Sequence, residues 1–129
     1  MFELTVTTHF AAAHQLKMVA HKCENLHGHN WKVEVCVAGS ELDHAGLLID
    51  FGELKRYVAT VIDGLDHRFL NELEYFKNGN PSSEHIAVYI ADQLAGMLTE
   101  TRAKISRVKV WESENSCATY IPDAQGQPL

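Results

Sequence analysis

The sequence predicts one α+β domain over residues 1–129, in which four antiparallel strands carry two helices on one face. Three observations predict this fold. Apolar and polar residues alternate at both ends of the chain, helical spacing of apolar residues occurs twice between them, and 129 residues are enough to bury one core. The expected order of elements is therefore strand, strand, helix, helix, strand, strand.

Two strands are expected in the first third of the chain. In the first, every second position belongs to one face, which is formed by Phe2, Leu4, Val6, Thr8, Phe10 and Ala12. Residues 27–38 alternate in the same way and place on one face Trp31, Val33, Val35 and Val37. We expect both strands to be half-buried and to pair antiparallel.

Two helices are expected in the middle of the chain. The first begins after Asp50, a good capping residue, and its apolar stripe is formed by Leu54, Val58, Val61, Ile62 and Leu65. The second begins at Pro81-Ser82-Ser83-Glu84 with Ser82 as the cap, and its stripe is formed by Ile86, Ile90, Leu94 and Met97. Residues 66–80, between the two helices, are expected to be mostly loop.

Two more strands, residues 105–112 and 117–121, are expected after the second helix, with Val108 and Val110 on the buried face. An open four-stranded sheet has two edges, and their unpaired backbone groups favour association with another chain. We therefore expect the chain to associate with copies of itself through these edges.

Composition and charge exclude several classes of protein. The net charge of -6 argues against a nucleic-acid-binding protein, because phosphate contacts need a basic face. No apolar run approaches the length of a membrane span, and the first residues lack the basic start and apolar core of a signal peptide. Three cysteines, a low and odd number, suit a reducing compartment. A soluble cytoplasmic protein is expected.

Eight histidines stand out in this composition, and three of them are expected to converge. His27 and His29 are two residues apart in a strand, so both side chains lie on the face of Trp31. His14 is in phase with Phe10, so all three imidazoles meet at one end of the sheet if the two strands are antiparallel neighbours. Three histidines with one open position are typical of a catalytic Zn²⁺ site. The alternative is that each histidine only hydrogen-bonds to the backbone.

Further candidate residues accompany the histidines. The thiol of Cys23, four residues before His27, is either a base or nucleophile beside the metal or a fourth ligand that makes the site structural. Asp66-His67 is a candidate acid–base couple in which the carboxylate orients the imidazole. Glu112, at the end of a strand, either anchors a polar ligand or caps the strand at the surface.

The remaining residues of these types are expected to play no part in the chemistry. His9 and His44 are expected to be exposed, and His85, in the first turn of a helix, is expected to be structural. Cys36 and Cys117 are expected to pack in the fold rather than react.

Several motifs together resemble the 6-pyruvoyltetrahydropterin synthase superfamily over essentially the whole chain. In order along the sequence they are Phe10-Ala11-Ala12-Ala13-His14, Cys23-x-x-x-His27-Gly28-His29, Leu65-Asp66-His67, Pro81-Ser82-Ser83-Glu84 and Trp111-Glu112-Ser113. Each motif is modest, but the ordered set is specific. The spacing of three residues between Cys23 and His27 resembles that of the bacterial branch, which makes 6-carboxytetrahydropterin for queuosine biosynthesis.

The resemblance implies roles for the candidate residues. His14, His27 and His29 match zinc ligands, Cys23 matches a catalytic cysteine, and Asp66 with His67 match its partners in a proton relay. Glu112 matches the carboxylate that anchors the pterin ring through its 2-amino group and N3–H. The resemblance also implies the tunnelling fold, in which three subunits join their sheets and two trimers stack into a homohexamer with active sites between subunits.

The activity that the resemblance implies is a zinc-dependent lyase. It would convert 7,8-dihydroneopterin triphosphate to 6-carboxy-5,6,7,8-tetrahydropterin, acetaldehyde and triphosphate. Lys17, Lys22 and Arg68 flank the motifs and are candidates to bind the triphosphate, the alternative being ordinary surface cations. Three other functions stay open: a 6-pyruvoyltetrahydropterin synthase with the same site, a non-catalytic zinc- or pterin-binding protein, and a zinc hydrolase with His67 or Glu112 as base.

Overall fold

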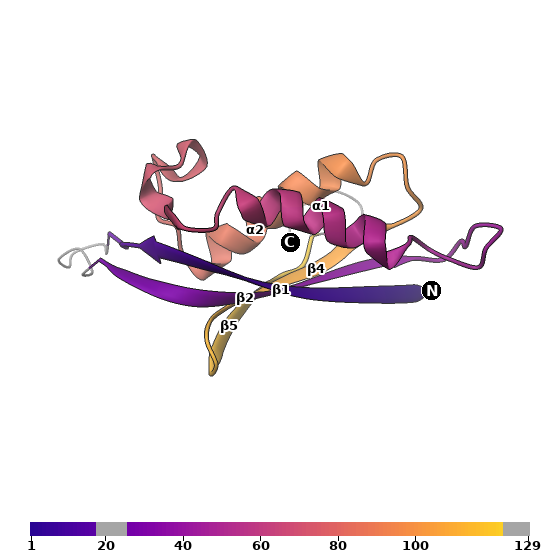
Figure 1. Cartoon of the computed structure of the whole chain (residues 1–129), viewed down its shortest axis with the longest axis horizontal. Helices are drawn as coiled ribbons and strands as arrows, with labels where there is room; N and C mark the ends of the chain where they lie inside the picture. Colours follow the sequence, from indigo (N-terminus) through magenta and orange to yellow (C-terminus); the bar gives the residue numbers. More distant parts are fainter. Residues whose placement is uncertain (18–25, 123–129) are drawn as a thin grey trace.

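A computed structural model of the chain describes residues 1–17 and 26–122. Its elements, in chain order, are β1 (Phe2–His14), β2 (His27–Gly39), α1 (Phe51–Asp63), β3 (Arg68–Phe69), the 3-10 turns η1 (Leu70–Glu72) and η2 (Glu74–Phe76), α2 (Ser83–Met97), β4 (Lys104–Ser113) and β5 (Ser116–Tyr120). Both helices lie on the same face of a single twisted sheet (Figure 1). The α+β class and the order of the long elements are therefore confirmed.

The sheet has five strands in the order β3-β1-β2-β4-β5, one more than the sequence predicted. The four long strands pair antiparallel, and the additional strand, β3, runs parallel to β1 beside Ala12 and Ala13. It lies in residues 66–80, which were expected to be mostly loop and which also form η1 and η2. A two-residue strand is too short to show any alternation, so the sequence pattern could not reveal it.

Alternation along the strands determines which face of the sheet is buried. In β1, Val6, Phe10 and Ala12 are buried, whereas the intervening Thr5 and His9 are exposed. In β2, the predicted apolar face is fully covered, with an exposed fraction of 0% at Trp31, Val33, Val35 and Val37. The apolar sides of both helices cover this face, and the opposite face of the sheet carries the polar side chains.

Both helices begin where capping residues predicted. The carboxylate of Asp50 accepts a hydrogen bond from the backbone N–H of Glu53 at 3.1 Å, and the hydroxyl of Ser82 accepts one from the N–H of His85 at 3.2 Å. All five residues of the predicted α1 stripe are buried, and so are Ile86, Ile90 and Leu94 of α2. Among the described residues, no helix is long and apolar enough to cross a membrane.

The pairing of β1 with β2 brings His14, His27 and His29 to one end of the sheet. The two strands run side by side over their full length of 13 residues. Their register places His14 opposite His27 and Ala12 opposite His29. Because residues two apart on a strand share a face, His14 and His29 point to the same side, that of the helices.

The Asp50 cap gives a test of this fold. Replacing Asp50 with Ala should lower the free energy of unfolding by about 1 kcal/mol, because one N–H of the first turn loses its acceptor. Asp63, at the other end of α1, is exposed and makes no such bond. Asp63→Ala is the matched control and should be neutral or slightly stabilising, since an acidic residue is unfavourable at a helix C-terminus. Urea unfolding followed by circular dichroism measures both, and equal losses would contradict the assigned cap.

Candidate active site

His14 is more deeply buried than His29, the other predicted ligand whose side chain is described. The side chain of His14 is 0% exposed, although its imidazole is polar. The ring Nδ1 lies 2.8 Å from the backbone carbonyl oxygen of Pro81, at the entrance to α2. Because a carbonyl oxygen only accepts, Nδ1 must carry the hydrogen, and the lone pair of the neutral ring is then on Nε2. This tautomer is the one that a metal ligand binding through Nε2 requires.

His29 and Trp31 complete an aromatic cluster around His14. The ring centroids of His14 and His29 are 5.2 Å apart, and each imidazole packs edge-on against the indole of Trp31 at 5.0 and 5.3 Å. The indole N–H donates to the carbonyl of Ala12 at 3.2 Å, which fixes the ring between the two strands. Trp31 therefore forms the apolar wall against which both histidines are oriented.

Glu112 brings a carboxylate to the same point. It alternates with the buried Val108 and Val110 of β4, so its side chain lies on the helix side of the sheet, next to a shift of register between Trp111 and Ser113. Its Oε1 is 3.1 Å from Nε2 of His29, and its Oε2 accepts a hydrogen bond of 3.3 Å from the hydroxyl of Ser83. Glu112 thus connects β4 to β2 and to the first turn of α2.

These three side chains fit a metal ion. His14 and His29 each offer a ring nitrogen and Glu112 offers a carboxylate oxygen, and these three atoms lie within 4.8 Å of one another. Zinc bound at about 2.0–2.2 Å from nitrogen or oxygen needs its ligands roughly 3.3 Å apart, close to the 3.1 Å between His29 and Glu112. Two imidazoles and a carboxylate are a donor set that zinc accepts. Among the described side chains, this is a candidate metal centre.

Three predicted site residues fall partly or wholly outside the described structure. The backbone of His27 pairs with that of His14 in register. Nothing further is described of the His27 side chain. Cys23 lies outside the described residues, and so does Lys22.

The pair Asp66-His67 is fixed to the edge of β1. The N–H of Ala11 donates to Asp66 Oδ1 at 2.9 Å, and the N–H of His67 donates back to the carbonyl of Ala11 at 2.6 Å. His67 has a φ of 59°, in the left-handed region that few residues other than glycine adopt. Asp66 Oδ2 lies 3.0 Å from Nδ1 of His67, so the carboxylate orients the imidazole as predicted.

The surroundings of Asp66 favour its charged form. The hydrogen bond from the N–H of Ala11 is the main cause and lowers the pKa of the Asp66 carboxyl. Desolvation, the next cause, acts in the opposite direction, and the hydrogen bond and charge of His67 lower the pKa further. The imidazole of His67 is 81% exposed, so it can exchange protons with a bound molecule or with solvent.

A hollow of about 500 Å³ lies where β3, β1 and β2 run side by side, next to His67. Its lining includes His29 from the candidate metal centre, His67 from the acid–base pair, and Arg68 of β3.

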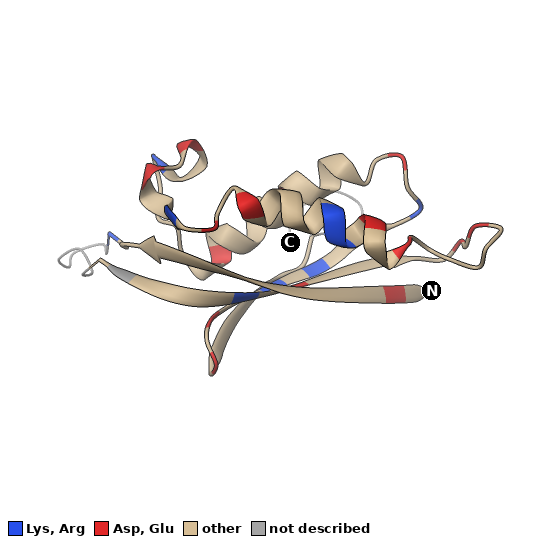
Figure 2. Cartoon of the chain, viewed as in Figure 1, with Lys and Arg blue, Asp and Glu red and all other residues tan. Residues whose placement is uncertain are grey.

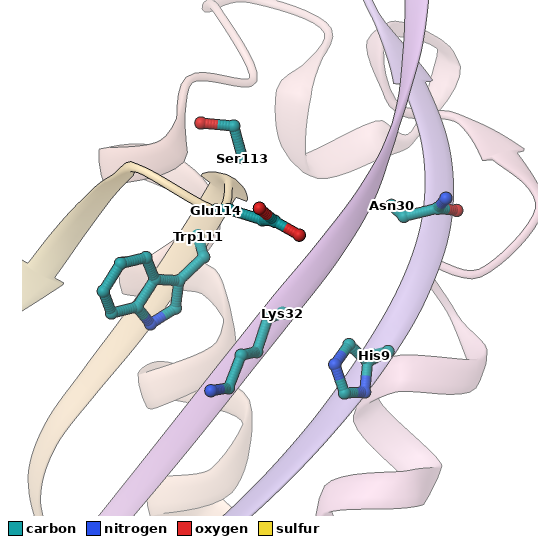
Figure 3. Close-up of a pocket in the computed structure, with 6 residues that line it drawn as sticks. All are labelled: His9, Asn30, Lys32, Trp111, Ser113 and Glu114. Atoms are coloured by element: carbon teal, nitrogen blue, oxygen red, sulfur yellow. The ribbon is translucent and has the colours of Figure 1, made fainter.

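A second hollow, of about 450 Å³, lies on the other face of the sheet, with the helices behind the strands (Figure 3). His9, Lys32 and Trp111 line it from three neighbouring strands, where His9 pairs with Lys32 and Lys32 with Trp111. His9 therefore points away from the metal centre and is exposed, as predicted.

The remaining predictions are mostly confirmed. His44 is exposed, and His85 is structural, because its Nδ1 bonds to the carbonyl of Asn80 at 2.6 Å. Cys36 is buried, and burial raises the pKa of its thiol, so it packs rather than reacts. The prediction that Cys117 packs was wrong: it is exposed on β5, a short strand at the edge of the sheet.

Sequence reasoning missed the positioning roles of Pro81, Ser83 and Trp31. The carbonyl of Pro81 and the hydroxyl of Ser83 bind His14 and Glu112 across more than 25 positions of sequence. The run Pro81-Ser82-Ser83-Glu84 was interpreted as a helix start. One feature of the sequence could have pointed to Ser83. It is a polar residue in the first turn of the helix, and Ser82 already provides the cap.

The fold and this site define an α+β protein of the tunnelling-fold class with a candidate metal centre at the end of its sheet. The solved structure of 6-pyruvoyl tetrahydropterin synthase from Caenorhabditis elegans matches it with a TM-score of 0.83, over 95% of this chain and 96% of that chain, at 25% identity. The sequence profile of 6-pyruvoyl tetrahydropterin synthase matches residues 3–123. The chain belongs to the 6-pyruvoyl tetrahydropterin synthase family.

Curated relatives in this family carry different names. The 6-carboxy-5,6,7,8-tetrahydropterin synthase of Bacillus subtilis is 34% identical over 132 residues, 97% of this chain and 88% of the relative. The human 6-pyruvoyl tetrahydrobiopterin synthase is 38% identical over 104 residues, 77% of this chain and 70% of the relative. A dihydroneopterin monophosphate aldolase of Pyrococcus furiosus is 37% identical over 103 residues, 80% of this chain and 82% of the relative. These names share a pterin chemistry and differ in the product.

The lowered pKa of Asp66 gives a prediction of pH dependence. A carboxyl whose folded-state pKa lies below its unfolded value, about 3.9, stabilises the fold above that pH and loses this contribution as pH falls through the folded pKa. Asp66→Asn should therefore lower the melting temperature at pH 7 by an amount that is constant down to about pH 5 and shrinks below about pH 4. Melting curves across this range measure it, with Asp63→Asn as the control. A difference that grows as pH falls would contradict the assigned ionisation.

Proposed function

We propose that the chain is a zinc-dependent lyase that converts 7,8-dihydroneopterin triphosphate to 6-carboxy-5,6,7,8-tetrahydropterin, acetaldehyde and triphosphate, a step of queuosine biosynthesis. The observation that carries this proposal is the distance of 3.1 Å between the carboxylate of Glu112 and the imidazole of His29. A pterin and its reacting side chain are one molecule joined at C6. An anchor for the ring must therefore belong to the same site as the groups that act on the side chain, and Glu112 and His29 lie in one site.

Glu112 is suited to anchor the pterin ring. The 2-amino group and N3–H of a pterin present two parallel donors, which a carboxylate accepts with both oxygens. Ser83 donates to Oε2 of Glu112, so the carboxylate is already oriented before a ligand arrives. Preorganisation of this kind reduces the entropy lost on binding.

His14, His27 and His29 are proposed to hold the zinc ion, with His27 in place of Glu112, whose carboxylate is assigned to the pterin. Bound there, zinc would act as a Lewis acid toward the hydroxyl oxygens of the substrate side chain. The contribution of the protein is to orient its ligands: the carbonyl of Pro81 holds His14 in the Nδ1–H tautomer, and Trp31 limits the position of both described imidazoles. Burial of His14 keeps water away from this part of the site.

Cys23, Asp66 and His67 are proposed to move the protons. A thiolate at Cys23 removes a proton from the side chain, and His67 delivers or removes another. The ionised carboxylate of Asp66, 3.0 Å from Nδ1 of His67, keeps the hydrogen on that nitrogen, so Nε2 exchanges protons with the substrate. One water supplies the second oxygen of the carboxyl that remains at C6 when acetaldehyde is lost, and the ring takes up the electrons, so the reaction needs no external redox cofactor.

The choice of product rests on the spacing of Cys23 and His27, which are separated by three residues as in the queuosine branch. The human relative, which is named for the pyruvoyl product, has a comparable identity to this chain. A 6-pyruvoyltetrahydropterin synthase, which eliminates triphosphate and keeps the side-chain carbons, is therefore the second candidate function.

The open edges of the sheet support a proposed homohexamer with active sites between subunits. β3 pairs with β1 only at Ala12 and Ala13, so most of the outer edge of β1 lacks a neighbouring strand among the described residues. β5 forms the opposite edge. Pairing of these two edges between copies would close the sheet into a barrel.

Product analysis tests the proposed function. The zinc-loaded protein is incubated without oxygen with 7,8-dihydroneopterin triphosphate, and the pterins are identified by mass spectrometry alongside an acetaldehyde assay. Acetaldehyde with a 6-carboxy product is the expected result. A pyruvoyl product without acetaldehyde would favour the second candidate, and unchanged substrate would contradict both.

Cys23→Ala should reduce kcat by about 10²–10⁴-fold, because the side chain loses its proton acceptor. The matched control is Cys117→Ala, since Cys117 is an exposed thiol on the edge strand β5. Zinc content per chain should be unchanged in both variants. A loss of zinc from Cys23→Ala would instead identify Cys23 as a ligand and the site as structural.

Glu112→Gln should raise KM for the pterin substrate by roughly tenfold or more, because one pterin donor would face an amide N–H in place of a carboxylate oxygen. The control, Glu114→Gln, changes a neighbouring carboxylate that lines the hollow on the other face of the sheet. Steady-state kinetics and zinc analysis separate the roles of Glu112. An unchanged KM would argue against its role as the anchor.

A further inference from the structure

A small hollow of about 420 Å³ lies beside the metal centre and combines two lysines with a polar loop. It is lined by Lys17, Lys77, Asn78, Gly79 and Asn80. No carboxylate is among these lining residues. The two cationic side chains come from segments 60 positions apart in the sequence, one following β1 and the other following η2.

Asn80 builds one wall of this hollow. Its side-chain oxygen accepts from the N–H of Lys17, and its side-chain NH₂ donates to the carbonyl of Lys17, each at 2.7 Å. The side-chain amide of Asn80 thus satisfies both backbone groups of Lys17, as a paired strand does within a sheet. Lys17 itself lies beyond the end of β1 at His14. The carbonyl of Asn80 is itself bonded by the His85 ring at 2.6 Å. The backbone that carries Lys17 is therefore fixed in place.

Candidate functional residues lie on three neighbouring strands of the sheet, and Lys17 follows the outermost of these strands, β1. Glu112 lies on β4, His29 on β2 and His14 on β1, and these strands are neighbours in that order. Lys17 follows His14 by three residues, a reach of about 10 Å in extended chain. Asn80 directly precedes Pro81, whose carbonyl binds His14. The lysine hollow is thus linked to His14 by two chain segments, through Lys17 after β1 and through Asn80 before Pro81.

We infer that this hollow binds the terminal phosphates of the substrate, with Lys17 and Lys77 as the cationic contacts. The inference rests on the proposed function and deepens it. A dihydropterin triphosphate has its ring at one end, its reacting hydroxyls in the middle and its phosphates at the other end. Glu112, the histidines and the lysine hollow occur in the same order, and lysine ammonium groups are good partners for phosphate oxygens.

One carboxylate competes for Lys77. Oε2 of Glu74 is 3.1 Å from Nζ of Lys77, and both side chains are mostly exposed, at 60% for the lysine and 89% for the glutamate. Exposed pairs of this kind are weak, so a polyphosphate can displace Glu74. Figure 2 shows basic residues both at the end of β1 and in the segment between β3 and α2, at the same end of the molecule.

Binding of inorganic tripolyphosphate tests the inference without depending on catalysis. The probe is titrated by calorimetry into the zinc-loaded chain and into the variants Lys17→Gln, Lys77→Gln and Lys55→Gln. Lys55, on α1, is exposed and outside the hollow, so its variant is a control for the same change of charge. The probe can also chelate zinc, but it does so equally in the parent and the three variants. Differences in Kd between these proteins therefore measure the contribution of each lysine.

The expected result is a roughly tenfold weaker Kd for Lys17→Gln and for Lys77→Gln, with Lys55→Gln equal to the parent. Equal affinity of all four proteins, or an equal loss in Lys55→Gln, would overturn the inference. Circular dichroism spectra show whether each variant is folded.

Kinetics give a second and separate readout. In Lys17→Gln and Lys77→Gln, KM for the dihydropterin triphosphate should rise with kcat unchanged, and KM for the corresponding monophosphate should change less. A fall in kcat alone would contradict a phosphate-binding role. If the parent protein binds tripolyphosphate as expected but leaves the pterin unchanged, the lyase proposal fails and the anion site stands.

Discussion

The antiparallel pairing of β1 with β2 is the constraint on which the candidate site depends. Thirteen residues of each strand pair in a single register, and this register alone places His14 and His29 on one face at one end of the sheet. A slip of one residue would move a whole set of side chains to the other face. The fully buried row from Trp31 to Val37 opposes such a slip, because it would expose that row to water. The hydrophobic core therefore also determines the position of the candidate metal ligands His14 and His29.

The helical layer contributes to the site through a few specific contacts. The carbonyl of Pro81 determines the tautomer of His14, and the hydroxyl of Ser83 orients Glu112. Both residues stand at the beginning of α2, whose apolar side is buried against the sheet. The acid–base pair Asp66-His67 is held to β1 by two hydrogen bonds with Ala11. The sheet thus supplies the ligands, and the segments that return from the helices determine the orientation of these side chains.

Much of this arrangement could be predicted from the sequence, because it follows from periodicity. Alternation identified the buried face of β1 and β2, helical spacing identified both stripes, and His27-x-His29 in phase with His14 predicted where the histidines meet. Other features depend on contacts between distant segments, which no local pattern encodes. They include the two-residue strand β3, the irregularity of β4 at Glu112, and the asparagine that binds the backbone of Lys17. The exposure of Cys117 was mispredicted because β5 lies at the edge of the sheet.

The central claim is that the end of this sheet holds a catalytic zinc ion with an open position. X-ray absorption at the zinc edge of the zinc-loaded protein tests it most directly. We predict a first shell of nitrogen and oxygen at about 2.0–2.1 Å, with no sulfur. A sulfur scatterer at about 2.3 Å would show that a cysteine completes the coordination. That result would contradict the account, since a closed site of this kind is structural and leaves no thiol to carry the proposed proton transfer.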